Sequence, residues 1–212
     1  MKKSIAIATV SLILCSASAF AATTGSLVNS IYTNEGVIDA TAIGKNATAV
    51  AAGISATHNS KLGHVVQDIH TNGGDIYAEA LSRNAVAVAG GVNASHNAEI
   101  KRGVVNSVYT NGGTIAASAL AVDATAVSGG VNATDNARVG GPVIQHISTN
   151  GGEINSIANG IRSIAVSAGV NLAENAKVRG FIYNGVNTNG GFVYSYAGEQ
   201  DDTAVAGGVN VE

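Results

Sequence analysis

A short repeat determines what this chain can fold into. The tetrapeptide Thr-Asn-Gly/Glu-Gly recurs at nearly constant intervals, starting at Thr33, Thr71, Thr110, Thr149 and Thr188. The tripeptide Gly-(Val/Ile)-(Asn/Ser) follows each of these threonines at one fixed offset, starting at Gly53, Gly91, Gly130, Gly169 and Gly208. Units this similar cannot each bury a core alone, so they must stack on their neighbours. The repeats are 27–64, 65–103, 104–142, 143–181 and a truncated 182–212.

Each repeat contains four short segments with the pattern of β-strands. In the third repeat, aliphatic Val104 and Val108 flank the amide Asn106 at every second position of 104–110, and apolar side chains recur at every second position of 115–119. Asn-Gly-Gly separates the two segments. Alternation with a period of two indicates a strand rather than a helix, and Asn-Gly-Gly favours a tight turn. We therefore predict an all-β solenoid of five ~39-residue repeats, with two strand–turn–strand coils per repeat. One large four-sided coil per repeat is the alternative.

Equivalent positions should form columns when the repeats stack. Side-chain amides in such a column can hydrogen-bond to one another along the stack, and an aliphatic column can fill the core. An amide also stands between the two aliphatic positions of each first segment, for example Gln67 and Asn106. The predicted stacking ladder comprises Asn34, Asn72, Asn111, Asn150 and Asn189, together with a second column of Asn59, Asn97, Asn136 and Asn175, which is also predicted to mark a turn. The predicted core column comprises Val50, Val88, Val127, Val166 and Val205.

Residues 1–21 have the pattern of a secretory signal peptide. Lys2 and Lys3 precede an apolar run, and Ala19-Phe20-Ala21 forms an A-x-A cleavage site. The apolar run is too short to span a membrane. We expect export, a mature solenoid domain of residues 22–212 without a membrane span, and a location outside or on the surface of a Gram-negative cell.

Composition argues against several classes of function. Removal of Lys2 and Lys3 leaves nine basic residues against 14 acidic ones, a net charge of −5, and no basic stripe that would favour nucleic acid. The single Cys, Cys15, lies inside the signal peptide. His58 and His96 occupy one column, but Asp135 and Glu174 fill it in later repeats, as expected of a solvated turn. We predict no catalytic, metal or cofactor site and no enzyme.

A family resemblance adds to this interpretation. The segment Asn72-Gly73-Gly74-Asp75-Ile76-Tyr77-Ala78 resembles the Asn-x-Ala-x-Ile half of curlin repeats, and the recurring Gly-Val-Asn is similar to Fap fibre subunits. Curlins are exported bacterial subunits whose strand–turn–strand units stack into extracellular amyloid fibres. The resemblance implies a biofilm or fimbrial filament, together with a nucleator or an outer-membrane secretion partner.

The ends of the repeat array carry the expected function. Both end coils should be uncovered, and uncovered strands offer backbone groups for pairing with another chain. We therefore expect head-to-tail self-assembly into a filament. The alternative is a monomeric or partner-capped adhesin that binds through aromatic side chains of the last repeat; drift in a terminal repeat would equally account for these aromatics. This contact patch would comprise Phe181, Tyr183, Phe192, Tyr194 and Tyr196.

Overall fold

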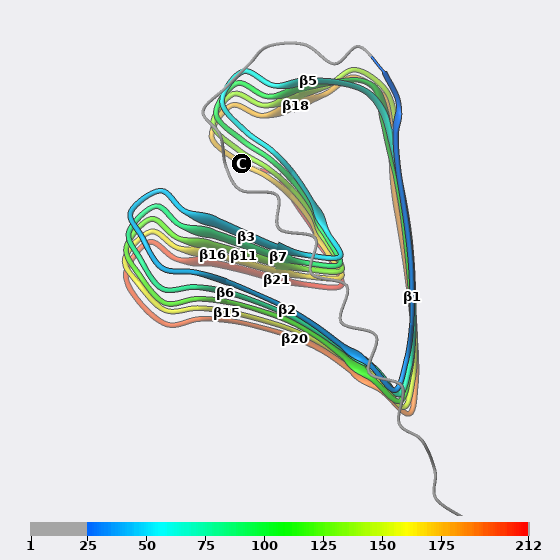
Figure 1. Ribbon diagram of the computed structural model, residues 1–212. Helices are drawn as coiled ribbons and strands as arrows, with labels where there is room; N and C mark the ends of the chain where they lie inside the picture. The colour runs from blue at the N-terminus through cyan, green and yellow to red at the C-terminus, as the bar shows by residue number, and fades with distance from the viewer. Residues whose placement is uncertain (1–24, 212) are drawn as a thin grey trace, which may run out of the picture.

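The chain winds into a parallel β-solenoid. A computed structural model describes residues 25–211, which form 22 strands and contain no helix. Strands of successive repeats lie side by side and pair in parallel, so that Leu27 lies opposite Val65 and Val104 opposite Val143 (Figure 1). The prediction of an all-β solenoid whose strands recur with the period of the sequence repeat is confirmed. The predicted signal peptide, 1–21, lies outside the described residues.

The prediction of two coils per repeat is wrong. Every strand pairs with the equivalent strand of the next repeat, so each repeat is one coil. We number these coils one to five in chain order. Five coils at the ~4.8 Å spacing of paired strands place the first and last strands of a sheet about 19 Å apart.

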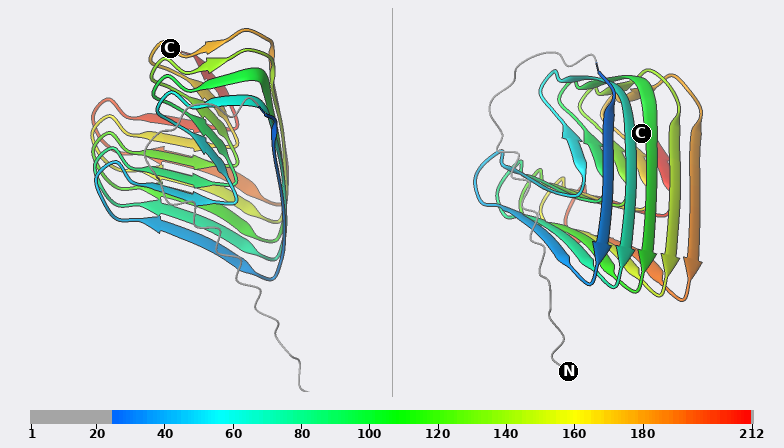
Figure 2. Two further views of the ribbon diagram at one scale, coloured as in Figure 1. Left: turned by 45° about the horizontal axis from the view of Figure 1, so that its top comes forward. Right: turned by 45° about the vertical axis from the view of Figure 1, so that its right-hand side comes forward.

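The first side of the coil is a tall parallel sheet, which stands upright in Figure 1. The right-hand view of Figure 2 shows its long strands as parallel arrows. Two short strands, β13 (Arg138–Val139) and β18 (Lys177–Val178), extend its upper end and represent the brief fourth segment of the repeat. The long strands are β1 (Leu27–Asn34), β5 (Lys61–Asn72), β9 (Glu99–Asn111), β14 (Val143–Asn150) and β19 (Ile182–Asn189).

The second and third sides are two sheets that lie close together (Figure 1). Each contains five strands, one from each coil. The second sheet comprises β2 (Val37–Ala42), β6 (Asp75–Ala80), β10 (Thr114–Ala119), β15 (Glu153–Ala158) and β20 (Phe192–Ala197). The third comprises β3 (Thr48–Ala51), β7 (Val86–Ala89), β11 (Thr125–Ser128), β16 (Ile164–Ser167) and β21 (Thr203–Ala206).

The fourth side is a sheet of short strands. Sequence periodicity joins these strands to the third side, but in the structure a corner separates the two. Gly90 occupies this corner in the second coil with φ of 60°, a conformation that glycine adopts without strain. The fourth sheet comprises β4 (Ile54–Ala56), β8 (Val92–Ala94), β12 (Val131–Ala133), β17 (Val170–Leu172) and β22 (Val209–Val211).

Close stacking at the corner explains the second sequence signature. A Cβ atom on Gly91 would lie 2.7 Å from Val127 Cγ1 and 2.9 Å from the carbonyl oxygen of Gly130 in the next coil. Side chains do not tolerate contacts this short, so the first position of Gly-(Val/Ile)-(Asn/Ser) must be glycine wherever another coil follows.

The turn after the first sheet explains the Thr-Asn-Gly-Gly signature. Gly73 has φ of 67°, and a Cβ on Gly74 would approach Thr33 Oγ1 of the preceding coil to 2.7 Å. The first glycine therefore permits the turn, and the second lets two coils meet. The Thr side chain lies inside, against the second glycine of the next coil.

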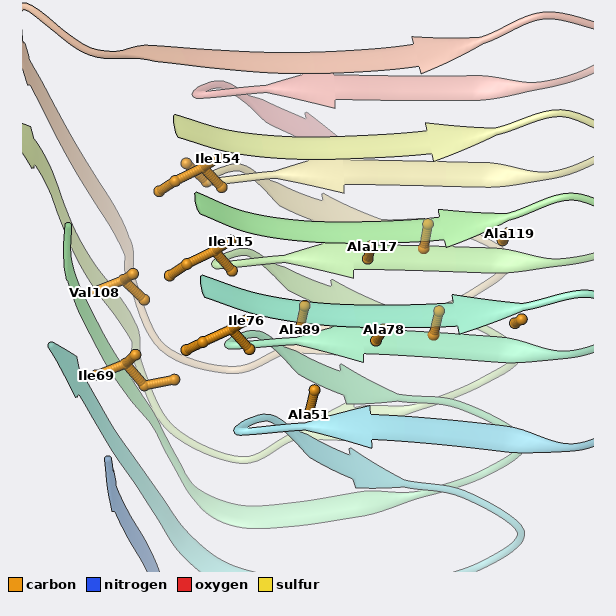
Figure 3. Close-up of a cluster of buried hydrophobic side chains, with 14 of the residues drawn as sticks. Ala51, Ile69, Ile76, Ala78, Ala89, Val108, Ile115, Ala117, Ala119 and Ile154 are labelled. Atoms are coloured by element: carbon orange, nitrogen blue, oxygen red, sulfur yellow. The ribbon is translucent and has the colours of Figure 1, made fainter. Parts of the chain in front are cut away.

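The main core lies between the first three sides. Isoleucine and valine side chains, including Ile69, Ile115 and Ile154, fill the angle between the first and second sheets (Figure 3). Alanines such as Ala78 and Ala89 fill the narrow space between the second and third sheets. Small side chains there allow the two sheets to lie close together. A second cluster, with Val92 and Val104, fills the space under the fourth side.

Coil length changes once, between the first and second coils. Leu62 pairs with Ile100, whereas His64 pairs with Gly103, so the register shifts between the two pairs. The extra residue is accommodated as an irregularity of β5 and β9, and the columns on either side therefore remain aligned.

Candidate functional site: the two end faces

Both end coils present strands that are paired on one side only. In the second, third and fourth sheets, the strands of the first and fifth coils stand at opposite edges. We call the outward side of the first coil the N-terminal face and that of the fifth coil the C-terminal face. Within residues 25–211, the outward backbone groups of these edge strands have no partner strand. Such edges are templates for another β-chain.

Apolar columns that are buried in the inner coils are only partly buried at the ends. Ile147 and Ile154 are 2% and 0% exposed, whereas their equivalents in the fifth coil, Val186 and Val193, are partly exposed. The end coils lack one neighbour each, so their share of the core faces outward.

The predicted Asn34 column forms a continuous side-chain ladder. Asn72 Nδ2 donates to Asn34 Oδ1 at 2.8 Å, and Asn111 Nδ2 donates to Asn72 Oδ1 at 2.8 Å. Asn150 and Asn189 continue the series at 2.9 and 3.0 Å. Every amide donates toward the N-terminal face and accepts from the C-terminal side. The ladder therefore has a direction.

A second, buried ladder was missed by sequence reasoning. Asn132 Nδ2 donates to Asn93 Oδ1 at 2.8 Å, and Asn171 Nδ2 donates to Asn132 Oδ1 at 2.9 Å. All three side chains are at most 1% exposed. The ladder starts at Ser55, whose hydroxyl accepts from Asn93 Nδ2 at 3.4 Å, and its last donor is Asn210. The third position of Gly-(Val/Ile)-(Asn/Ser) was the signal that could have found it.

The amides of the first segment bind across the coil. Gln67 Nε2 donates to the carbonyl oxygen of Gly90 at 2.6 Å and to Asn106 Oδ1 at 3.1 Å. Asn106 Nδ2 repeats the pattern with the carbonyl oxygen of Gly129 at 2.9 Å. These amides therefore join the first sheet to the corner between the third and fourth sides, besides linking neighbouring coils.

The second predicted Asn column has another role. Asn59, Asn97, Asn136 and Asn175 all have positive φ, between 60° and 64°. Within residues 25–211, no side-chain hydrogen bond links members of this column, and it is the backbone that pairs, for example Asn97 N–H with the carbonyl oxygen of Asp135. The prediction that these residues mark a turn is confirmed, because Asn tolerates the left-handed conformation, whereas the prediction that they belong to a stacking ladder is wrong.

The predicted valine column stacks as a separate cluster. Val88, Val127 and Val166 are 0% exposed and Val205 is 7% exposed, with Val50 partly buried beside them. This cluster is separate from the two larger ones, and the partly buried Val50 and Ile164 pack against it.

The five aromatic residues of the last repeat do not form one patch. Phe192, Tyr194 and Tyr196 alternate along β20 and are exposed on the outer side of the second sheet. Tyr183 is exposed on β19 of the first sheet, and Phe181 precedes that strand. The turn after β19 separates the two groups, so a single contact patch was a wrong expectation.

One turn column is ionisable. His58 and His96 stack with ring centroids 4.8 Å apart, and His96 Nδ1 lies 3.5 Å from Asp135 Oδ2. Asp135 also forms a hydrogen bond with Glu174, which raises the pKa of the Glu174 carboxyl from 4.5 to about 7. The Glu174 carboxyl therefore keeps its proton to a higher pH than an ordinary glutamate does.

Within the described residues, no group of three or more His, Cys, Asp or Glu side chains could hold a metal ion. Residues 25–211 also include no helix of the length and hydropathy needed to cross a membrane. Comparison with protein-family models, with curated proteins and with solved structures finds no match for this chain.

Proposed function

We propose that this chain is an exported structural subunit that stacks end to end into an extracellular filament, in the manner of a functional amyloid. The observation that carries the proposal is the match between the two end faces. The N-terminal face of one copy, placed on the C-terminal face of another, continues in register the columns of the four strands that the fifth coil contains, β19, β20, β21 and β22. The contact is heterologous and leaves both outer faces open, so it propagates.

Exposed apolar side chains of the first coil support this register. Val28, Val37 and Ile43 are 70%, 55% and 79% exposed. One coil beyond the fifth, the same columns would place Val28 over Tyr183 and Val37 over Phe192. Stacking would cover one side of these side chains and leave them partly exposed, as Val66 and Val105 are in the inner coils, and it favours association by about 25 cal/mol per Å² of apolar surface buried.

Ile43 would reach a site that no other coil offers. Its column contains Gly198 in the fifth coil, and the Tyr196 ring lies over that glycine, within 2.7 Å of where a Cβ would stand. The incoming Ile43 would therefore pack against an aromatic ring. The aromatic residues of the last repeat act here as part of the assembly face.

Polar groups also match across the proposed contact. Asn189 Nδ2 donates to Asn150 Oδ1, so the acceptor Asn189 Oδ1 is left directed to the C-terminal face. Asn34 Oδ1 accepts from Asn72 Nδ2, so the donor Asn34 Nδ2 is left directed to the N-terminal face. The donor of one copy thus meets the acceptor of the next. Lys45 would also arrive between Glu199 and Asp201, a favourable arrangement of charge.

Two glycines allow each face to be blocked separately. A Cβ on Gly208 has nothing nearer than 3.9 Å, and a Cβ on Gly36 has nothing within 4 Å. In the stack, these positions would resemble Gly130 and Gly74, where a Cβ would collide with the adjoining coil at 2.8 Å and 2.7 Å. Gly208→Ala and Gly36→Ala should therefore leave the subunit folded and prevent filament growth.

The test is electron microscopy of residues 22–212 and of these two variants, with Ser118→Ala on a lateral face as the control. We expect unbranched filaments from the wild type and the control, and single rods from both glycine variants. Discrete wild-type rods that never elongate, or equal growth of all four proteins, would overturn the proposal.

Cross-linking tests the register. Opposed positions in adjacent coils stand about 4.8 Å apart, which suits a disulfide. Residues 22–212 contain no Cys, so Asn34→Cys with Asn189→Cys should give a ladder of covalent oligomers after oxidation. Asn34→Cys with Asn150→Cys, one coil out of register, should give none.

The adhesin alternative would need one aromatic patch on a rod with covered ends. The division of the aromatics between two faces, and their match to exposed first-coil side chains, favours the assembly role.

A further inference from the structure

The outer side of the first sheet contains a groove that extends well beyond the proposed assembly contact and shares Tyr183 with it. It has a volume of about 480 Å³ and crosses β5, β9, β14 and β19. Its size falls within the range of ligand sites, which is about 300–1,000 Å³. Because it lies on a lateral side of the solenoid, stacking of coils at either end would leave it open.

Two pairs of rings flank this groove. His70 and Tyr109 are tilted against each other with centroids 5.7 Å apart, and His146 and Tyr183 likewise at 5.1 Å. The tyrosines are 38% and 49% exposed, so ring surface remains available. They belong to the third and fifth coils, about 10 Å apart along the stack. An extended molecule can therefore touch both.

Gly185 shapes the end of the groove. Ser107 and His146 occupy its column in the third and fourth coils, but a Cβ at Gly185 would stand only 3.0 Å from Tyr183 Oη and 3.1 Å from Tyr183 Cε1. The Oη end of the Tyr183 ring therefore lies over the glycine. About half of the Tyr183 surface stays exposed, so the ring lies outside the core.

Polar groups lie between the two ring pairs. The hydroxyls of Ser107 and Ser148 and the amide of Asn187 line the groove, and each can donate and accept. Asp68 adds a carboxylate, and His70 Nε2 lies 3.2 Å from Asp68 Oδ1. The lining therefore combines ring faces with short, closely spaced hydroxyl, amide and carboxylate groups.

We propose that this groove binds a neutral glycan. The apolar C–H face of a sugar ring packs on an aromatic face, and its hydroxyls require neighbouring groups that both donate and accept. An acidic glycan or a nucleic acid is disfavoured, because Asp68 is the fixed charge of the lining and the chain is acidic overall. The rings and polar groups repeat across coils, as an extended polymer of similar units requires.

The site does not depend on filament formation. In a filament, however, each subunit would contribute one groove to the same side, and a long polysaccharide could occupy several at once. Such multivalency raises overall affinity well above that of one groove.

Affinity electrophoresis of the full chain tests the proposal. The probes are hydroxyethyl cellulose, xyloglucan, galactomannan and soluble starch in the gel, with dextran sulfate as the acidic probe. The Gly208→Ala background keeps rods single, so retardation reports on the groove alone. The variants are Tyr109→Ala, Tyr183→Ala and Gly185→Ala. The matched control is Tyr77→Ala, because Tyr77 is 37% exposed on the outer side of the second sheet.

We expect at least one neutral polysaccharide to retard the protein. Each tyrosine variant should weaken binding about two- to tenfold, the effect of losing one aromatic contact, and Tyr77→Ala should not. Gly185→Ala keeps every ring but displaces Tyr183, so it should also weaken binding. Circular dichroism establishes that the variants fold, and Tyr183→Phe should bind if Tyr183→Ala does not fold. Retardation by dextran sulfate only, by no probe, or equal loss in Tyr77→Ala would overturn the proposal.

Discussion

The third and fifth coils share the same pattern of apolar positions, but these positions differ in how deeply they are buried. In the third coil, Val104 and Ile115 are 0% exposed and neighbours lie on both sides. In the fifth coil, the equivalent Ile182 and Val193 are partly exposed, and one side of each strand is open. Stacking therefore completes a coil, and the end coils are folded but incomplete. The difference identifies, without any special motif, the two faces at which the proposed assembly would occur.

The largest effect should come from truncating the core in an inner coil. Ile115→Ala removes a fully buried side chain from the third coil and should lower the free energy of unfolding by about 2–5 kcal/mol. Ile38→Ala makes the same change in the first coil, where the side chain is partly buried, and should lower it by about half as much or less. Urea denaturation of both variants measures the difference. Equal losses would mean that the first coil is as well covered as the third.

Substitutions of the corner glycines should also distinguish an inner coil from an end coil. Gly130→Ala forces a Cβ to within 2.8 Å of Val166 Cγ1 and should destabilise the solenoid by about 1–3 kcal/mol. Gly208→Ala has open space and should change stability by less than about 0.5 kcal/mol. The thermal unfolding of single rods gives the comparison. A large loss for Gly208→Ala would show that something already covers the C-terminal face.

Interrupting the two Asn ladders should cost different amounts of stability, because only one of them is buried. Asn132→Ala leaves an acceptor on Asn93 and a donor on Asn171 without partners in the interior, which should cost about 1–3 kcal/mol. Asn111→Ala interrupts the outer ladder, where water can replace the lost bonds, and should cost about 0.5–1 kcal/mol. Chemical denaturation of the two variants checks this order. A reversed order would assign the main cohesion to the outer ladder.

The smallest effect is expected from the column that contains Asp135 and Glu174, where stability should depend on pH. Because the pKa of Glu174 is raised from 4.5 to about 7 in the folded chain, the folded state binds the extra proton between these values. The contribution of this pair to stability is full below pH 4.5 and is lost as the pH rises through about 7. Glu174→Gln should therefore flatten the change in melting temperature between about pH 5 and pH 8. An unchanged pH profile in that variant would exclude the raised pKa of Glu174.

Sequence periodicity predicted most of the fold because it identifies equivalent residues. It could not decide between one and two coils per repeat, since both arrangements place Val104 and Val143 in one column and differ in whether these residues lie in neighbouring coils or two coils apart. The corner at Gly90 decides, because it places the third and fourth strands on different sides of one coil.

Contacts at the end faces were predictable where the alignment of equivalent residues is enough to bring their side chains together. Asn34 and its equivalents stack because identical amides meet in register. Asn97 occupies a column equally regular in sequence, but its backbone turns left-handed there, and the side chain forms no ladder. The aromatic residues were misassigned because Tyr183 and Tyr194 are close in sequence, while a turn places them on two different sides.

The in-register pairing of whole repeats also bears on how such a chain can change over time. Removing residues 104–142 would join Gly103 directly to Val143 and place β14 beside β5 with the columns still aligned, because Val65 and Val143 both pair with Val104 in the same register. Duplication of the same stretch would insert a coil between neighbours that already fit it. The gene can therefore lengthen or shorten the rod in whole-repeat steps while both terminal surfaces, and whatever binds them, stay the same.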